Sequence, residues 1–378
     1  MNRLRFYEIP ALLIVLLFSG NWLLEAAPPR PKNVIIGYVF PRKAPLTELD
    51  IRGDMLTHIN YAFANIKGGQ LVAERPDDAA NLKALTGLRK RFPSLKVLIS
   101  VGGWSWSGGF SDMSLTKASR KKFIDGAVSF LREHELDGID LDWEYPGQPG
   151  AGNTYRPADR RNFTLLLGEL RKALNSARKP PGPKYLLTIA AGSSPRFLEH
   201  TEMRKVQKYL DYVNLMTYDF FVERGGKSGH HSNLYASAFS PDAPSGAASV
   251  TAFLRAGVPA KKLVLGVPFY GRGWKGAKSE NNGLYQDAAA AEGGMSWSNL
   301  TQSYIDKNGY SRWWDSAAKA PYLWKAGEGR VVTYDDPASL KEKCRFVKKR
   351  NMGGVMFWEY TSDDPDHTLL RTLHENLK

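Results

Sequence analysis

The sequence predicts an α/β protein in which eight parallel strands close into a (β/α)8 barrel, also called a TIM barrel. The first observation behind this prediction is that eight short runs rich in β-branched and aromatic residues occur along the chain. The second is that helical segments separate most of these runs, as parallel strands require. The length of 378 residues accommodates one large barrel or two ordinary domains.

Each predicted strand has the length and composition of a buried strand. In chain order the strands are Asn33–Phe40, Thr57–Ile66, Lys96–Trp104, the acidic run after Asp137, Tyr185–Ala191, Tyr212–Asp219, Lys262–Tyr270 and Gly354–Glu359. Apolar residues at helical spacing predict helices over Ala79–Phe92, Leu115–Glu135 and Pro157–Ala177. In barrels of this kind the C-terminal ends of the strands carry the active site.

The alternation of strands and helices is interrupted once, from Gly273 to about Tyr334. This stretch contains short strand candidates, such as Pro321–Lys325 and Arg330–Tyr334, but no long amphipathic helix. It is too long for a simple loop in a compact domain. We therefore predict a small α+β insertion domain between strands seven and eight. The expected limits are 274–334 for the insertion, with 28–273 and 335–378 for the two parts of the barrel.

The run from Asp137 to Pro146 reads DGIDLDWEYP and is the most informative stretch of the chain. Successive side chains of a strand point to opposite faces, so the alternating acids share one face and the alternating apolar residues share the other. The acidic face holds Asp140, Asp142 and Glu144, and the apolar face holds Ile139, Leu141 and Trp143. A row of carboxylates is costly in an apolar core, so this face must line a polar, functional space.

Neighbouring carboxylates cannot all ionise independently, because each charge raises the pKa of the next. One acid of the row can then stay protonated near neutral pH. Glu144 is the last acid, at the end of the strand, where a side chain can reach a ligand as a general acid. A metal site and a solvated acidic edge strand are the alternatives from this run alone.

These ten residues resemble the catalytic signature Asp-x-x-Asp-x-Asp-x-Glu of family 18 glycoside hydrolases, the chitinases. All four acids, beginning with Asp137, stand at the spacing of that signature. The resemblance implies the same barrel, and it also agrees with the insertion, which walls one side of the substrate cleft in many of these enzymes.

Other stretches resemble further motifs of the same family. Ser100, Gly102 and Gly103 resemble its second motif, in which the serine supports the inner acid Asp140, and Tyr38 matches another residue that supports this acid. Met216, Tyr218 and Asp219 match its Met-x-Tyr-Asp element. Tyr270 and Arg272 resemble seventh-strand residues that line the sugar site, and Trp358 matches the floor under the sugar being cleaved. Trp104 resembles a platform on the leaving-group side, and Tyr145 follows the catalytic acid.

The chain departs from some relatives just after the Met-x-Tyr-Asp element. Those relatives carry a second aromatic platform there, a tryptophan, whereas this chain has Phe220 and Phe221. This difference in sequence affects how strongly a long substrate chain is held on the leaving-group side.

The resemblance implies a mechanism in which the substrate supplies the nucleophile and no metal or cofactor takes part. The N-acetyl oxygen attacks the anomeric carbon while Glu144 protonates the leaving oxygen. Asp142 orients the acetamide and stabilises the oxazolinium, Tyr218 donates to the acetamide oxygen, and Asp140 tunes Asp142. The expected substrates are chitin and chitooligosaccharides. The alternatives are a chitin-binding lectin that has lost catalysis and a hydrolase of N-glycans or peptidoglycan.

Composition and the first residues predict where the protein acts. Arg3 and Arg5, the apolar run Ala11–Phe18 and the small residues Ala26 and Ala27 predict a signal peptide over 1–27, with an uncleaved membrane anchor as the alternative. We expect a secreted monomer that does not remain associated with the membrane after processing. The net charge of +14 is spread along the chain without a nucleic-acid motif, so nucleic acid is not an expected partner. One cysteine excludes an intrachain disulfide.

Overall fold

The computed structural model describes residues 33–42, 45–47, 51–177, 184–291 and 295–377. The predicted signal peptide, 1–27, lies outside the described residues. Eight parallel strands form a closed barrel: β1 (Val34–Val39), β2 (His58–Lys67), β4 (Lys96–Gly102), β5 (Gly138–Asp142), β6 (Leu186–Gly192), β7 (Tyr212–Met216), β8 (Leu263–Pro268) and β15 (Gly354–Trp358). The predicted (β/α)8 barrel is therefore confirmed.

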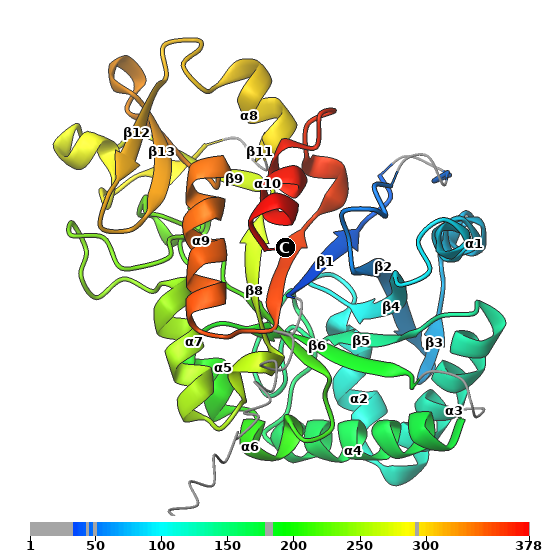
Figure 1. The fold of residues 1–378 in the computed structure, drawn as a ribbon. Helices are drawn as coiled ribbons and strands as arrows, with labels where there is room; N and C mark the ends of the chain where they lie inside the picture. Colours follow the sequence, from blue (N-terminus) through cyan, green and yellow to red (C-terminus); the bar gives the residue numbers. More distant parts are fainter. Residues whose placement is uncertain (1–32, 43–44, 48–50, 178–183, 292–294, 378) are drawn as a thin grey trace, which may run out of the picture. The chain divides into compact units, whose positions relative to one another are not determined.

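Closure of the barrel brings its first and last strands together. The strands follow chain order from β1 through β2, β4, β5, β6, β7 and β8 to β15, and β15 pairs again with β1. In this last pairing Val34 lies opposite Gly354 and Gly37 lies opposite Phe357. Figure 1 shows β1, in blue, beside β15, in red.

Helices connect most of the barrel strands and supply the layer that covers them. They are α1 (Asp78–Gly87), α2 (Phe110–Leu115), α3 (Lys117–Glu133), α4 (Asp159–Ala177), α5 (Pro195–Glu199), α6 (Met203–Val206), α7 (Gly246–Arg255), α9 (Pro337–Lys349) and α10 (Thr368–Leu377). Thr116 caps α3 and Asp336 caps α9, each by a reciprocal hydrogen-bond pair with the serine three residues later. A short strand, β3 (Gln70–Val72), forms a hairpin with β2.

The acidic strand β5 lies inside the sheet, because it pairs with β4 on one side and β6 on the other. This arrangement excludes an acidic edge strand. The apolar face of the stretch packs outward: Trp143 stacks on Phe110 of α2, with ring centroids 5.0 Å apart, and meets Phe163 of α4 edge-on at 5.5 Å. Alternation therefore separates the residues as predicted, with Trp143 in the helix layer and the acids directed into the barrel.

A second, antiparallel sheet lies between barrel strands β8 and β15. It contains β9 (Tyr270–Lys275), β10 (Ala289–Ala290), β11 (Met295–Ser296), β12 (Ser311–Asp315), β13 (Ala320–Lys325) and β14 (Arg330–Thr333), with the short helix α8 (Trp297–Ser303). A small core of its own surrounds Trp274 and Trp324. The predicted α+β insertion is thus present at the predicted place, and residue 274 falls inside β9, which already belongs to the second sheet.

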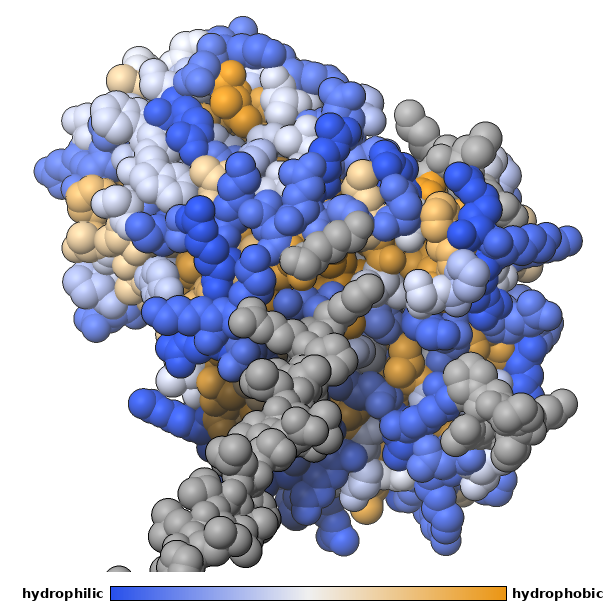
Figure 2. Space-filling view, viewed as in Figure 1, coloured by the Kyte–Doolittle hydropathy of each residue, from blue (hydrophilic) through white to orange (hydrophobic). Residues whose placement is uncertain are grey.

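Polar and apolar residues are distributed differently over the surface and the interior. The face shown in Figure 2 is mainly hydrophilic, and hydrophobic side chains occupy smaller areas between the hydrophilic ones.

In the described part of the chain, no helix combines the length and the apolar character needed to cross a membrane. Cys344 is buried in α9, and burial raises the pKa of its thiol to about 12.

Candidate active site

A cavity of about 1700 Å³ opens where the barrel strands end. Its lining includes Gly102, Asp142, Gly192, Met216 and Trp358, which are the last residues of β4, β5, β6, β7 and β15. Ten of the predicted site residues line this cavity: Trp104, Asp142, Glu144, Tyr145, Met216, Tyr218, Asp219, Tyr270, Arg272 and Trp358. The other three, Tyr38, Gly103 and Asp140, lie behind this lining.

Asp140 is the innermost acid and is fully buried. Its Oδ2 accepts hydrogen bonds from the hydroxyls of Tyr38 at 2.9 Å and Ser100 at 2.8 Å. Its Oδ1 accepts from Thr188 Oγ1 at 2.5 Å and Asn214 Nδ2 at 3.2 Å. Burial raises the pKa of Asp140, and these four hydrogen bonds oppose that rise by stabilising the charged form.

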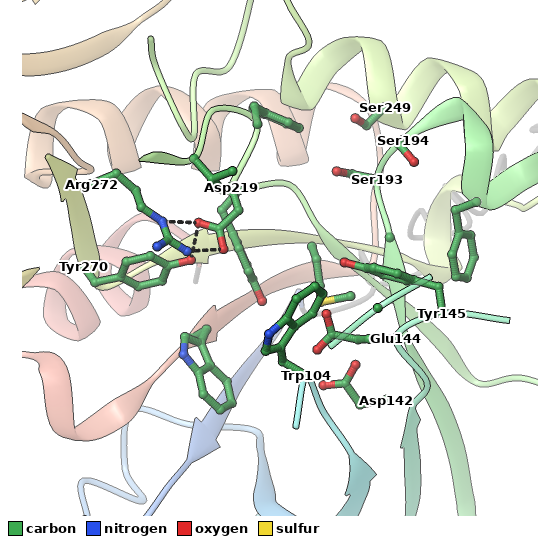
Figure 3. A pocket seen from close by; sticks show the side chains of 18 of the residues that line it. Trp104, Asp142, Glu144, Tyr145, Ser193, Ser194, Asp219, Ser249, Tyr270 and Arg272 are labelled. Carbon is green, nitrogen blue, oxygen red and sulfur yellow. Dashed lines mark hydrogen bonds and ion pairs between the residues drawn. The ribbon is translucent and has the colours of Figure 1, made fainter. Parts of the chain in front are cut away.

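Asp142 and Glu144 lie next to each other at the end of β5, beside Trp104 and below Tyr145 in the view of Figure 3. Burial raises the pKa of Asp142 well above its usual range, and the neighbouring charges of Glu144 and Asp140 raise it further. Burial also raises the pKa of Glu144 to about 7. The pair therefore holds a proton at neutral pH, at the wall of the cavity.

The backbone around these acids is fixed by a close approach of β4 and β5. Gly102 has a φ of +104°, and a Cβ there would lie 2.3 Å from the carbonyl oxygen of Asp142. Gly103, with a φ of +77°, donates its N–H to the same carbonyl at 2.8 Å. Only glycine combines this conformation with this proximity, which explains the paired glycines of the motif.

Asp219 is the centre of a second charged cluster, drawn with dashed lines in Figure 3. Arg272 donates to both of its carboxylate oxygens, at 2.9 and 2.7 Å, and the hydroxyl of Tyr270 donates at 2.8 Å. The fully buried His231 places its Nδ1 3.5 Å from the same carboxylate. Burial raises the pKa of Asp219, but the interactions with His231 and Arg272 outweigh it and hold this pKa well below its usual range.

Aromatic side chains form the apolar surfaces of the cavity. Trp358 stacks on Phe63 with ring centroids 5.5 Å apart and an interplanar angle of 18°, and its ring lies 5.9 Å from that of Tyr38. Trp104 is 43% exposed and meets Tyr145 nearly edge-on at 6.5 Å. An exposed indole beside a buried acid is suited to stacking on a sugar ring.

The sequence interpretation missed Thr188, Asn214 and Ser107. Asn214 stands two positions before Met216, so the alternation that assigned Met216 and Tyr218 to one face also assigns Asn214 to it. Thr188 could have been found in the same way on β6. Ser107 follows a strand end and gave no periodic signal.

The two phenylalanines after Asp219 have different environments. Phe220 lines the cavity, whereas Phe221 packs against the core of the second sheet, with its ring centroid 5.4 Å from that of Tyr285.

The alternative of a metal site finds no support in the arrangement of the acids. Among the residues that the structure describes, no group of three or more His, Cys, Asp or Glu side chains is placed to hold a metal ion. Of the four acids in the run from Asp137 to Glu144, Asp140 accepts four hydrogen bonds from neutral side chains. Asp137, at the other end of β5, forms ion pairs with Arg89 and Lys96 at 3.3 Å each.

Comparison with known proteins identifies relatives of one kind. The family described as glycosyl hydrolases family 18 matches residues 34–363. Chitinase A1 of Niallia circulans is 45% identical over 314 residues, which cover 79% of this chain and 45% of that protein. The chain therefore spans less than half the length of this relative. A family 18 N-acetylglucosaminidase from Paenibacillus barengoltzii has a solved structure with a TM-score of 0.85 and 43% identity, covering 91% of this chain and 99% of that one.

A third similar protein was solved with a bound ligand. It is a class V chitinase from Nicotiana tobaccum in complex with NAG4, with a TM-score of 0.82 and 29% identity, covering 91% of this chain and 99% of that one.

Proposed function

The chain belongs to the glycosyl hydrolases of family 18, and from this premise we propose that it is a chitinase, which hydrolyses β-1,4 links between N-acetylglucosamine units. One observation carries the proposal: Glu144, with a pKa of about 7, lies beside Asp142 in the wall of a cavity of about 1700 Å³. A carboxylic acid that is protonated near neutral pH can protonate a leaving oxygen.

The proposed first step breaks the glycosidic bond with help from the substrate. The N-acetyl oxygen of the bound sugar attacks its anomeric carbon, and the pair of electrons of the broken bond goes to the leaving oxygen. Glu144 donates its proton to this oxygen, so the departing chain leaves as an alcohol. The product on the other side is a cyclic oxazolinium ion.

Asp142 and Tyr218 are proposed to hold the acetamide during this step. The carboxylate of Asp142 accepts the amide N–H and stabilises the positive charge of the oxazolinium. The phenol of Tyr218, which lines the cavity with Met216, donates to the acetamide oxygen. Asp140, held by four donors, is proposed to tune the pKa of Asp142, which its charge raises.

In the second step Glu144 acts as a base. It removes a proton from a water molecule that attacks the anomeric carbon, and the ring of the oxazolinium opens. Because two displacements occur at the same carbon, the configuration is retained. Apart from this water molecule, the two steps use side chains of this chain and the acetamide of the substrate.

The experiment that tests the proposal is a timed product analysis with the fully N-acetylated chitin hexamer. We expect shorter oligomers whose new reducing end is first formed as the β-anomer, detected by proton NMR before mutarotation. An α-anomer as first product would contradict the retaining mechanism, and intact hexamer would contradict the chitinase assignment.

The same experiment distinguishes a second candidate function. One of the similar structures is named an N-acetylglucosaminidase, which favours release of single N-acetylglucosamine units as an alternative. Monomer and pentamer as the first products would identify that activity, whereas internal cuts produce dimers, trimers and tetramers.

Secretion and a monomeric state are further parts of the proposal. Secretion is supported by Arg3 and Arg5 before the apolar run that ends at Phe18. N-terminal sequencing of protein recovered from the culture medium tests it, and light scattering of the purified protein tests the monomer.

A further inference from the structure

One end of the cavity, beside Trp358, contains two arginines and two aromatic rings. This group consists of Phe40, Arg42, Arg75 and Trp106, and we call it the arginine wing; all four residues line the cavity. The ring of Phe40 lies 5.8 Å from that of Trp358, so the wing continues directly from the floor of the proposed reacting site.

Arg75 is held in place within the wing. Its guanidinium lies over the ring of Phe40 at 4.2 Å and over that of Trp106 at 5.6 Å. Its Nη1 donates to the carbonyl oxygen of Pro41 at 3.1 Å. A half-buried guanidinium between two rings keeps a fixed position, because moving it would lose both contacts.

The two arginines differ in how their charge is balanced. Arg42 forms an ion pair at 3.2 Å with Glu359, whose side chain is 1% exposed. Arg75 makes no ion pair with any carboxylate among the residues that the structure describes. Among the described residues, no ion pair therefore balances the positive charge of Arg75 at the wall of the cavity.

The acids of the cavity lie elsewhere. Among the described lining residues the carboxylates are Asp142, Glu144, Asp219 and Asp242. Asp142 and Glu144 form the proposed reacting site, and Asp219 is paired with Arg272. Asp242 belongs to the segment before α7. The lining also holds Arg224 and Arg272, of which Arg272 is paired with Asp219, so the arginine wing is one positively charged part of the cavity.

Resting on the proposed function, we propose that the arginine wing is a specificity subsite that accepts N-acetylglucosamine and disfavours glucosamine. Chitin is often partly deacetylated, and each deacetylated unit carries an amine that becomes a cation when protonated. An acetamide is neutral and meets no repulsion from Arg75. Repulsion between two unit charges several Å apart near a protein surface corresponds to roughly a five- to tenfold penalty.

The test uses partly deacetylated chitin of known acetyl content. Products are sequenced by mass spectrometry on both sides of each cut, at a pH where the amine is protonated. By the proposed mechanism the reacting unit must carry an acetamide. Selection by the arginine wing is therefore measured as the glucosamine content of the units beyond the reacting unit. We expect about five- to tenfold depletion of glucosamine at one such position, on one side of the cut only, and a weaker depletion at high salt.

Three variants separate charge from packing. In Arg75→Gln we expect the depletion to weaken, so that the fraction of glucosamine at this position approaches its fraction in the whole substrate. Arg75→Lys keeps the charge and is expected to keep the depletion. Arg345→Gln removes one exposed positive charge from α9, outside the cavity lining, and is the matched control for net charge; it should keep the parental pattern.

Two outcomes overturn the inference, and they differ from failure of the proposed function. Arg75→Gln with the parental product pattern would show that the charge does not select substrate. Loss of selection in Arg75→Lys as well as in Arg75→Gln would assign the effect to packing. Failure of the proposed function appears separately, as a parent protein that leaves the fully acetylated hexamer intact.

Discussion

The backbone N–H of Glu144 donates a hydrogen bond to Oγ of Ser107 at 2.9 Å. The same hydroxyl lies 3.0 Å from the carbonyl oxygen of Asp142 and 2.8 Å from that of Gly103, so its single proton is available to either. Ser107 is fully buried. It therefore ties the turn after β4 to the end of β5, at the residue that is proposed to carry the catalytic proton.

Ser107→Ala is expected to misplace Glu144 without removing it. The N–H of Glu144 loses its acceptor, which costs about 1–3 kcal/mol if the group stays buried, and the local backbone relaxes. Since small displacements at a reacting centre are costly, we expect kcat to fall about tenfold while KM changes little. Steady-state kinetics on chitin oligomers measure both constants.

Ser111→Ala is the matched control for this prediction. Ser111 is likewise fully buried, but its hydroxyl donates to the carboxylate of Asp159 and accepts from Arg156 instead of bonding to the backbone of Asp142 and Glu144. Equal losses of kcat in the two variants would contradict a positioning role for Ser107 and indicate general destabilisation.

Glu144→Gln is expected to remove most of the activity and to leave binding intact. The amide has nearly the shape of the protonated acid but cannot give up a proton, and general acid–base catalysis contributes about 10²- to 10⁴-fold. Calorimetric titration with the hexamer should still detect binding. Turnover by Glu144→Gln at the parental rate would refute the assignment of Glu144 as the acid. Asp142→Asn, in comparison, should lower kcat more than it changes KM.

The buried acid also makes folding stability depend on pH. Burial raises the pKa of Glu144 from about 4.5 in the unfolded chain to about 7 in the folded protein. The folded state then binds more protons between these values, so its stability falls as pH rises from about 4.5 to about 7. At pH 8 we expect Glu144→Gln to be more stable than the parent by about 3 kcal/mol. Urea unfolding should show a much smaller difference at pH 4, and an equal difference at both values would be inconsistent with this cause.

Asp219→Asn is expected to move the alkaline limb of activity to lower pH. The charge of Asp219 contributes to the raised pKa of Glu144, so removing this charge lowers that pKa. The negative charge of Asp219 then no longer offsets the positive charge of Arg272, which favours the ionised acid further. We expect the alkaline limb of kcat/KM to shift by roughly 0.5–1 pH unit.

Arg272→Gln provides the opposite change and tests the sign. It removes a positive charge and leaves Asp219 in place, so the alkaline limb should move to higher pH. Shifts in the same direction for both variants would argue against an electrostatic origin.

The ion pair between Lys343 and Asp335 is buried at both ends, with side chains 3% and 0% exposed. Lys343 also donates to Oγ of Ser232 at 2.7 Å, which joins α9 to the segment after β7. Removing one partner leaves an uncompensated buried charge, so Lys343→Met should lower the free energy of unfolding by about 3–5 kcal/mol. Lys341→Met, an exposed position on the same helix, should change stability by less than about 0.5 kcal/mol, and denaturant unfolding compares them.

What could be read from single segments was predicted correctly. Alternation along β5 separated Trp143 from Asp140, and their contacts agree with it: Trp143 stacks on Phe110 of α2, whereas Asp140 accepts a hydrogen bond from Tyr38 inside the barrel. The strand count predicted the barrel, and the interrupted pattern predicted the second sheet. The ends of strands were less well defined: β7 ends at Met216 rather than at Asp219, because the chain turns where Asp219 adopts a positive φ of 59°.

The sequence by itself determined which side chains share a face, because that property repeats every two residues within one strand. Only the tertiary structure decided which faces meet. Thr188 and Asn214 reach Asp140, Ser107 reaches Glu144 and Arg75 reaches the cavity because a closed barrel sets distant segments side by side in one register. That register depends on the packing of the whole chain, and no local pattern records it.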